Sequence, residues 1–195
     1  MLSIEDLVHR FIHDPDFDHW LQPHQRSVEA ISLELANSLG LPMGKIRIAA
    51  RCHDVGKLAL SLDIWNKPGT LSMMEKRIVT LHSEIGEKMV AAHLNEASQR
   101  IVRHHHEWYD GNGYPDGLTG AAIPVEARII AVADAFDSLI SDRPYRKGIG
   151  QINALIEIWR CSGSQFDPII VRAFEDVLRQ GLPVHQIRLQ RKSAG

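Results

Sequence analysis

Seven side chains of the kinds that bind transition metals recur along this chain, at intervals suited to separate helices that converge on one point. They are five histidines and two aspartates, namely His24, His53, Asp54, His82, His105, His106 and Asp134. The intervals between the successive groups are 29, 28, 23 and 28 residues. Adjacent side chains on a helix point about 100° apart, so His53 and Asp54 can face two different metals, and an aspartate that contacts both would bridge them. The pattern therefore predicts a site for two divalent ions, built from several helices.

The types of ligand leave the identity of the metals open. Imidazole suits iron, zinc, copper or nickel, whereas carboxylate shifts the preference towards manganese. Iron or manganese are therefore the expected cofactors, with zinc and copper as alternatives by affinity. Asp54 and Asp134 lie in otherwise apolar helical segments, where a carboxylate without a partner is costly and metal coordination removes that cost. Because histidine ligands must be neutral, metal occupancy and activity are expected to fall below about pH 6.

Length, composition and charge limit the class of protein. A chain of 195 residues with 44% hydrophobic residues is large enough for one compact domain with a core. A net charge of −2 provides no basic field for a nucleic-acid polymer or an anionic membrane. Two cysteines without a framework spacing fit a reducing compartment, and no apolar run approaches the ~20 residues that span a bilayer. With no signal-peptide pattern at the N-terminus, these features predict a soluble cytoplasmic protein.

Helical signals occur along almost the whole chain, and alternation typical of strands is absent. Ser72 with Glu75 forms a capping box, Pro124 stands at a favoured first helical position, and Asp167 is an expected N-cap. The expected helices cover residues 3–12, 23–39, 44–55, 73–93, 97–106, 124–139, 152–160 and 168–180. The predicted fold is an all-α bundle of about seven helices. Residues 1–22 are interpreted as a helical extension, 23–181 as the catalytic domain and 182–195 as a tail.

A dense group of turn residues separates the last histidines from the helix that carries Asp134. It reads Asp-Gly-Asn-Gly-Tyr-Pro-Asp-Gly over residues 110–117, a composition that predicts a shaped loop.

Short motifs follow one another in a fixed order from residue 24 to residue 168. They are His24-x-x-x-Val28, His53-Asp54-x-Gly56-Lys57, Leu81-His82-x-x-Ile85-Gly86, His105-His106-Glu107, Asp110-Gly111-x-Gly113-Tyr114-Pro115, Ala127-Arg128-Ile129-Ile130-x-x-x-Asp134, Asp142-Arg143-Pro144-Tyr145-Arg146 and Gly163-x-x-Phe166-Asp167-Pro168. In content, order and spacing they resemble the HD-GYP family, a branch of the HD-domain phosphohydrolases. The resemblance implies an all-helical fold, a metal centre and hydrolysis of cyclic di-GMP by a hydroxide that bridges two metals. The expected product is linear pGpG, with further hydrolysis to GMP left open.

The resemblance also implies a role for each matching residue. The first metal would be held by His24, His53, Asp54 and Asp134, and the second by Asp54, His82, His105 and His106. Asp54 and Lys57 would be the catalytic residues, with Lys57 beside the substrate phosphate. The implied substrate-binding residues are Lys57, Gly111, Gly113, Tyr114, Pro115, Arg143 and Arg146. In the family the loop at 111–115 also draws signalling proteins, so a protein partner is a further expectation.

One position departs from the family pattern. Members with a third metal carry a glutamate four residues before the first histidine, where this chain has Trp20. Because an indole does not ligate a metal, we expect two metals rather than three.

Several alternatives stay open from the sequence. His104 competes with its neighbours for a ligand position. Asp137 is either a partner that orients a histidine or a polar helix contact, and Glu107 either hydrogen-bonds a ligand or faces solvent. The rival functions are hydrolysis of another nucleotide, binding of cyclic di-GMP without turnover, and a docking role that uses the loop.

Overall fold

The computed structural model of the chain describes residues 6, 8–10, 21–65, 67, 69–142 and 147–181. Within these ranges the regular secondary structure is helical, and one isolated bridge joins Ser162 to Phe166. The expected all-α fold is confirmed. Most of the predicted N-terminal extension, Trp20, Arg143, Arg146 and the predicted tail lie outside the described residues.

The helices follow the predicted order with small shifts at their ends. In chain order they are α2 (Gln22–Ser38), α3 (Met43–Cys52), the 3₁₀ helix η1 (Val55–Ala59), α4 (Leu62–Trp65), α5 (Met73–Val90), α6 (Glu96–His104), the 3₁₀ helix η2 (Gly120–Ala122), α7 (Val125–Ile140), α8 (Gln151–Arg160) and α9 (Pro168–Arg179). The short helices η1, α4 and η2 were not predicted. Each is shorter than two turns, and hydrophobic periodicity is not readable over so few residues.

The helix ends follow local chemistry. The capping box of α5 is formed as predicted, because Ser72 accepts from the Glu75 backbone N–H and Glu75 accepts from the Ser72 N–H. Asp167 caps α9 by accepting from the Ile169 N–H. Pro124 is the N-cap of α7 rather than its first helical residue.

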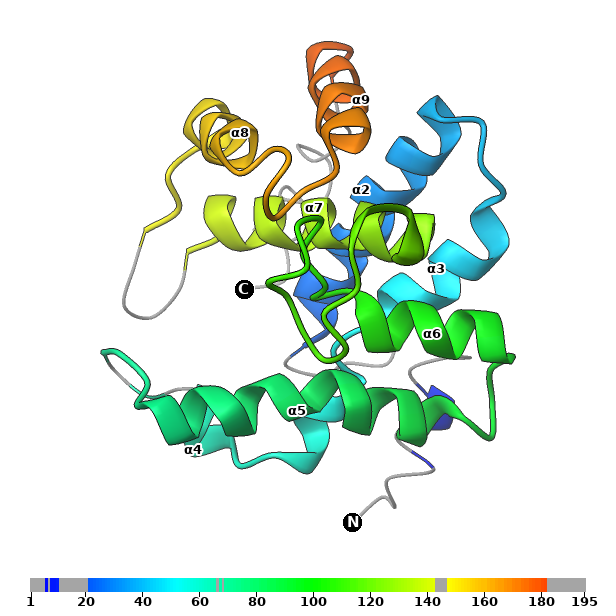
Figure 1. Ribbon diagram of the computed structural model, residues 1–195, viewed down its shortest axis with the longest axis vertical. Coiled ribbons are helices and arrows are strands. Elements are labelled where there is room, and N and C mark those ends of the chain that lie inside the picture. The colour runs from blue at the N-terminus through cyan, green and yellow to red at the C-terminus, as the bar shows by residue number, and fades with distance from the viewer. Residues whose placement is uncertain are drawn as a thin grey trace, which may run out of the picture.

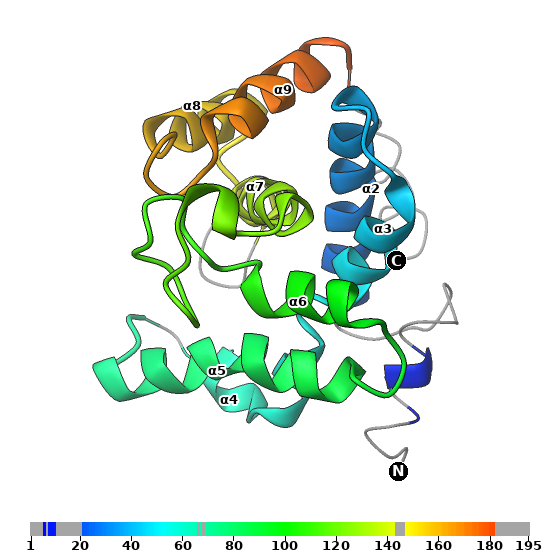
Figure 2. The same ribbon diagram turned by 45° about the vertical axis from the view of Figure 1, so that its right-hand side comes forward.

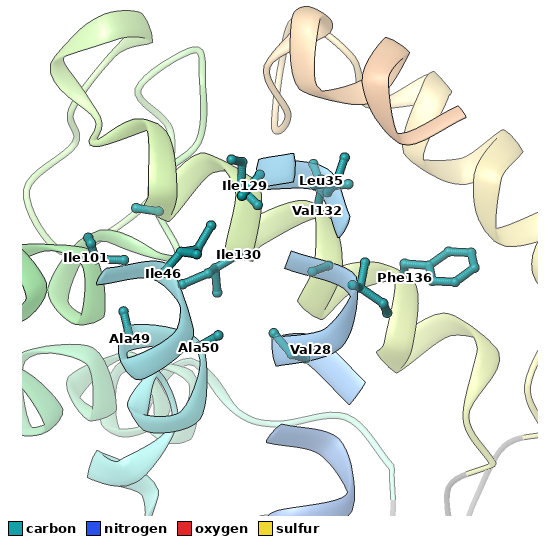
Figure 3. Close-up of a cluster of buried hydrophobic side chains, with 14 of the residues drawn as sticks. Val28, Leu35, Ile46, Ala49, Ala50, Ile101, Ile129, Ile130, Val132 and Phe136 are labelled. Carbon is teal, nitrogen blue, oxygen red and sulfur yellow. The ribbon is translucent and has the colours of Figure 1, made fainter. Parts of the chain in front are cut away.

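Helix α7 is the central element of the bundle (Figure 1). Its apolar residues Ile129, Ile130, Val132 and Phe136 are fully buried. Figure 3 shows Ile129, Ile130 and Val132 among side chains of three other helices, namely Val28 and Leu35 of α2, Ile46, Ala49 and Ala50 of α3, and Ile101 of α6. The Phe136 ring turns away from these and packs against Phe174 of α9, with ring centroids 4.8 Å apart. The side chains that reach the centre of the molecule from α7 are therefore held by a packed core on two sides.

A second layer closes the opposite side of the bundle. Helix α5 packs along η1 and α6, with α4 on its outer side, and the loop between α6 and α7 lies between α5 and the α7–α9 region (Figures 1 and 2). This arrangement brings the end of α3, the middle of α5, the end of α6 and the face of α7 to one place. Within the described ranges, none of the helices combines the length and apolar character that crossing a bilayer requires.

Candidate metal centre

Asp54 lies at the middle of the cluster of metal-binding side chains. It follows the last turn of α3 and is 1% exposed. Its Oδ2 atom is 3.6 Å from His24 Nε2 and 3.4 Å from His53 Nε2. Its Oδ1 atom is 3.4 Å from His82 Nε2. The two oxygens of one carboxylate therefore face two separate groups of histidines.

Three of the histidines are oriented by the same device. The Nδ1 atoms of His53, His82 and His105 each lie 2.7 Å from the backbone carbonyl three residues earlier. A carbonyl only accepts, so each Nδ1 carries the proton and donates it. The Nε2 atom of each ring is then left with a lone pair directed into the centre, the tautomer in which histidine binds metals.

Among the described residues, no N–H or O–H group donates a hydrogen bond to the Nε2 lone pairs of these three histidines. His53 Nε2 is buried and makes no hydrogen bond in the described part of the chain. His82 Nε2 and His105 Nε2 face each other at 3.3 Å. Because burial lowers the pKa of both His82 and His105, neither ring holds a second proton that it could donate. Two facing lone pairs repel unless a cation lies between them, so this donor set fits a metal.

The first histidine is anchored differently. His24, in the first turns of α2, donates from Nδ1 to Asp137 Oδ2 at 2.7 Å. Its Nε2 atom lies 3.0 Å from Asp134 Oδ1. Of the two readings left open for Asp137, the structure supports a partner that orients a histidine, because a carboxylate on the far ring nitrogen fixes the ring.

The spacing of the ligand atoms also fits metal ions. Metal–nitrogen and metal–oxygen bonds of about 2.0–2.2 Å place two ligands of one ion roughly 3.0–3.5 Å apart, as in the distances around Asp54. Two sets converge on shared points, one of His24, His53 and Asp54, the other of Asp54, His82, His105 and His106. Asp134 joins the first set through its contact with His24.

Lys57 already occupies one side of Asp54. It lies in η1, one turn after Asp54, and its Nζ atom is 2.5 Å from Asp54 Oδ2. Burial raises the pKa of the Asp54 carboxyl, but Lys57 and the histidines outweigh this and hold that pKa well below its usual range. Asp54 is therefore an anion at every pH at which the fold would be used, as a bridging ligand must be.

His24 differs in its affinity for protons from His82, His105 and His106, which form the other group. Burial lowers the pKa of His24, but hydrogen bonds to Asp134 and Asp137 and the charges of Asp134 and Asp54 raise it to about 9. In the other group burial is the largest cause and lowers the pKa of His82, His105 and, to about 3, His106. A metal must therefore displace a proton at His24 but not at the other three rings.

This difference predicts how metal binding depends on pH. At pH 7.5, below the raised pKa of His24, metal uptake is expected to release close to one proton, and affinity at the His24 group should fall about tenfold per pH unit on acidification. The group around His82 should be nearly insensitive to pH over the same range. Calorimetric titration with manganese(II) in buffers of different ionisation enthalpy measures the released protons. Uptake at both groups without proton release at pH 7.5 would contradict the assignment.

The loop between α6 and α7 is built around a buried carboxylate. Glu107 is 2% exposed and accepts the backbone N–H groups of Asp116 at 2.7 Å and Leu118 at 3.0 Å. Neither reading of Glu107 from the sequence matches the structure, because its carboxylate is buried and its hydrogen bonds among the described residues go to these two loop N–H groups rather than to one of the seven candidate ligands. Arg103 and His104 fix the loop from outside by binding both oxygens of Asp116, so His104 points away from the centre.

Loss of the Glu107 carboxylate is expected to loosen this loop. Glu107→Ala leaves two N–H groups without their charged acceptor, which should lower the free energy of unfolding by about 3 kcal/mol. Asp110→Ala is the matched control. Among the described residues the exposed Asp110 carboxylate accepts one local hydrogen bond, from the Asn112 N–H, so its loss should cost less than about 1 kcal/mol. Thermal unfolding and limited proteolysis between residues 107 and 120 measure both effects, and equal behaviour of the two variants would refute the role of Glu107.

Tyr114 connects the loop to the histidines. Its ring stacks on His106, with centroids 4.9 Å apart and an interplanar angle of 29°. Gly111 has a φ of +87°, and a Cβ on Gly113 would come within 2.1 Å of the Trp108 backbone nitrogen. The two glycines are therefore needed to fold the loop, whatever their relation to a substrate.

Sequence reasoning did not find every residue of this site. Trp65 lies against Lys57 and His82. Ser138 is 3.5 Å from Asp134 Oδ1. No motif marks either position, and only the placement of α4 and the turn of α7 brings them to the centre.

Comparisons with known proteins agree with this architecture. The HD domain model matches residues 15–170. The chain is 42% identical over 159 residues to the cyclic di-GMP phosphodiesterase response regulator RpfG of Xanthomonas campestris pv. campestris, covering 78% of this chain and 41% of that protein. The chain thus spans between about a quarter and about two fifths of the length of the curated relatives it matches.

Two solved structures share the fold. One is a cyclic GMP-AMP specific phosphodiesterase of Vibrio cholerae, with a TM-score of 0.66 and 20% identity, covering 94% of this chain and 50% of that one. The other is Bd1817, an HDG"Y"P protein of Bdellovibrio bacteriovorus, with a TM-score of 0.67 and 20% identity, covering 90% of this chain and 61% of that one. The chain belongs to the HD-domain family, and the predicted membership of its HD-GYP branch is confirmed.

Proposed function

We propose that this chain is a metal-dependent phosphodiesterase that hydrolyses cyclic di-GMP to pGpG, with residues 23–181 as the catalytic domain. One observation carries the proposal: the two oxygens of Asp54 face two groups of histidines, in which His53 Nε2 has no hydrogen-bond partner among the described residues and the Nε2 atoms of His82 and His105 face each other. A carboxylate so placed is suited to bridge two divalent ions. The similarity to RpfG supports cyclic di-GMP as the substrate.

Two metals are proposed, with iron or manganese as the expected pair. The first would be held by His24, His53, Asp54 and Asp134, and the second by Asp54, His82, His105 and His106. Such a pair supplies positive charge at the phosphate and lowers the pKa of water towards neutrality. The protein needs no nucleophile of its own.

Lys57 is proposed to act on the substrate rather than as a base. Its ammonium lies on the same carboxylate that faces both histidine groups and is 19% exposed, so it can reach a phosphate oxygen at the centre. A protonated amine cannot accept a proton, and its charge stabilises the phosphate or the leaving 3′ oxygen. Tyr114 and Pro115 would line the substrate side of the loop, and Arg143 and Arg146 are proposed as further phosphate or guanine contacts from the family resemblance.

An anaerobic turnover assay tests this function. The chain loaded with iron(II) or manganese(II) is given cyclic di-GMP, 3′3′-cGAMP and cyclic di-AMP separately, and the products are separated by chromatography. We expect pGpG from cyclic di-GMP at the highest kcat/KM and no product in chelator. Faster turnover of 3′3′-cGAMP, the compound for which three curated Vibrio cholerae relatives are named, would make 3′3′-cGAMP the substrate instead of cyclic di-GMP. Binding without product from any of the three would favour a binding or docking role.

A further inference from the structure

Trp65 lies where a residue could control the position of Lys57. It is the last residue of α4, the short helix on the outer side of α5 (Figures 1 and 2). The Lys57 Nζ atom is 4.9 Å from the centroid of the indole. The same indole meets the His82 ring edge to face, with centroids 5.9 Å apart and an interplanar angle of 87°. Trp65 therefore packs between the cation and one of the candidate metal ligands.

The contact with Lys57 uses the face of the indole rather than its N–H group. The Trp65 Nε1 atom is buried and has no hydrogen-bond partner in the described part of the chain. A buried donor without an acceptor is costly, so this N–H is not what holds the ring in place. The ring face, in contrast, carries the negative quadrupole that attracts an ammonium.

Metal binding would make this contact more important. Among the described residues, the Lys57 ammonium contacts two groups, the Asp54 carboxylate and the Trp65 ring. A carboxylate that bridges two ions gives most of its charge and lone pairs to them, and the ions also repel the nearby ammonium. The ring face is then the contact that keeps Lys57 at the centre instead of in solvent.

We propose that Trp65 is a positioning residue, which holds the Lys57 ammonium beside the phosphate through a cation–π contact. The effect on catalysis rests on the proposed function. The contact between Trp65 and Lys57 does not depend on it. Trp65→Phe keeps an aromatic face and should retain most of the activity. Trp65→Leu should lower kcat about tenfold with little change in KM.

A double-mutant cycle separates this role from packing against His82. If Trp65 acts through Lys57, then Trp65→Leu should have no further effect on kcat in a Lys57→Met background. A tenfold loss in both backgrounds would overturn the proposal and assign the effect to the metal ligands. Metal content is measured for each variant, and Trp159→Leu, a half-exposed tryptophan on α8, is the matched control.

A readout independent of turnover examines the contact directly. The full chain is labelled with ¹³C-lysine and loaded with zinc(II) as a diamagnetic metal, and the Lys57 ε-methylene signal is assigned by Lys57→Arg. Because a methylene above an aromatic face is shielded, its proton resonance should lie upfield, remain upfield in Trp65→Phe and return to the ordinary position in Trp65→Leu. An unshifted resonance in the wild-type chain would overturn the proposal. If no cyclic dinucleotide is hydrolysed, this measurement still decides where Lys57 lies.

Discussion

Replacement of Asp54 with alanine is expected to abolish metal binding and to lower turnover at least about a thousandfold, because one carboxylate serves both histidine groups. Removing a ligand that contacts only one ion would leave the second ion bound. Asp54 contacts His24 and His53 through one oxygen and His82 through the other. Both ions should therefore be lost together, as measured by metal analysis after dialysis.

The matched control for this variant is Asp176→Ala. Asp176 is an exposed aspartate on α9, so its removal changes the net charge equally without touching the centre. Metal content and kcat should remain those of the wild type. Retention of one ion per chain by Asp54→Ala would show that the carboxylate does not bridge.

Addition of a single methyl group at Gly56 is expected to destroy the centre without removing any ligand. A Cβ at this position would lie 2.0 Å from the His82 carbonyl oxygen and 2.6 Å from the Gly86 backbone nitrogen. Both neighbours are backbone atoms of α5, so the clash cannot be relieved by turning a side chain. Helix α5 must move away from η1, which should cost about 3 kcal/mol or more and separate His82 from Asp54.

Gly44→Ala tests whether this effect is specific. Gly44 lies in α3, and a Cβ there would meet nothing within 4 Å, so alanine should be neutral or stabilise by up to about 1 kcal/mol. Chemical denaturation measures both variants, and metal analysis measures the centre. Gly56→Ala protein with wild-type stability and full metal content would contradict the close packing of α5 on η1.

The sequence predicted which residues come together at the centre, but not the tautomers of its histidines. His53, His82 and His105 were selected by their motifs, and the structure brings them together around Asp54. That each ring donates to the carbonyl three residues earlier could not be predicted, because it depends on the side-chain rotamer and on packing around the ring. The choice of tautomer, and hence the direction of the lone pairs, is a tertiary property.

Glu107 and Asp137 illustrate why a sequence alone does not decide between such alternatives. Both are polar residues near ligand positions, and spacing alone is compatible with a buried or an exposed side chain. The loop folds back on Glu107, so its partners, the Asp116 and Leu118 N–H groups, are set by the turn conformation. Asp137 meets His24 across 113 residues of chain, a pairing that only the packing of α2 on α7 creates.

A crystal structure of the manganese-loaded chain, with anomalous scattering used to locate the ions, tests the central claim most directly. We expect two anomalous peaks about 3.5–4 Å apart on either side of Asp54. One should lie within bonding distance of His24, His53 and Asp134, and the other within bonding distance of His82, His105 and His106. A single peak, a third peak, or two peaks without Asp54 between them would contradict the proposed centre.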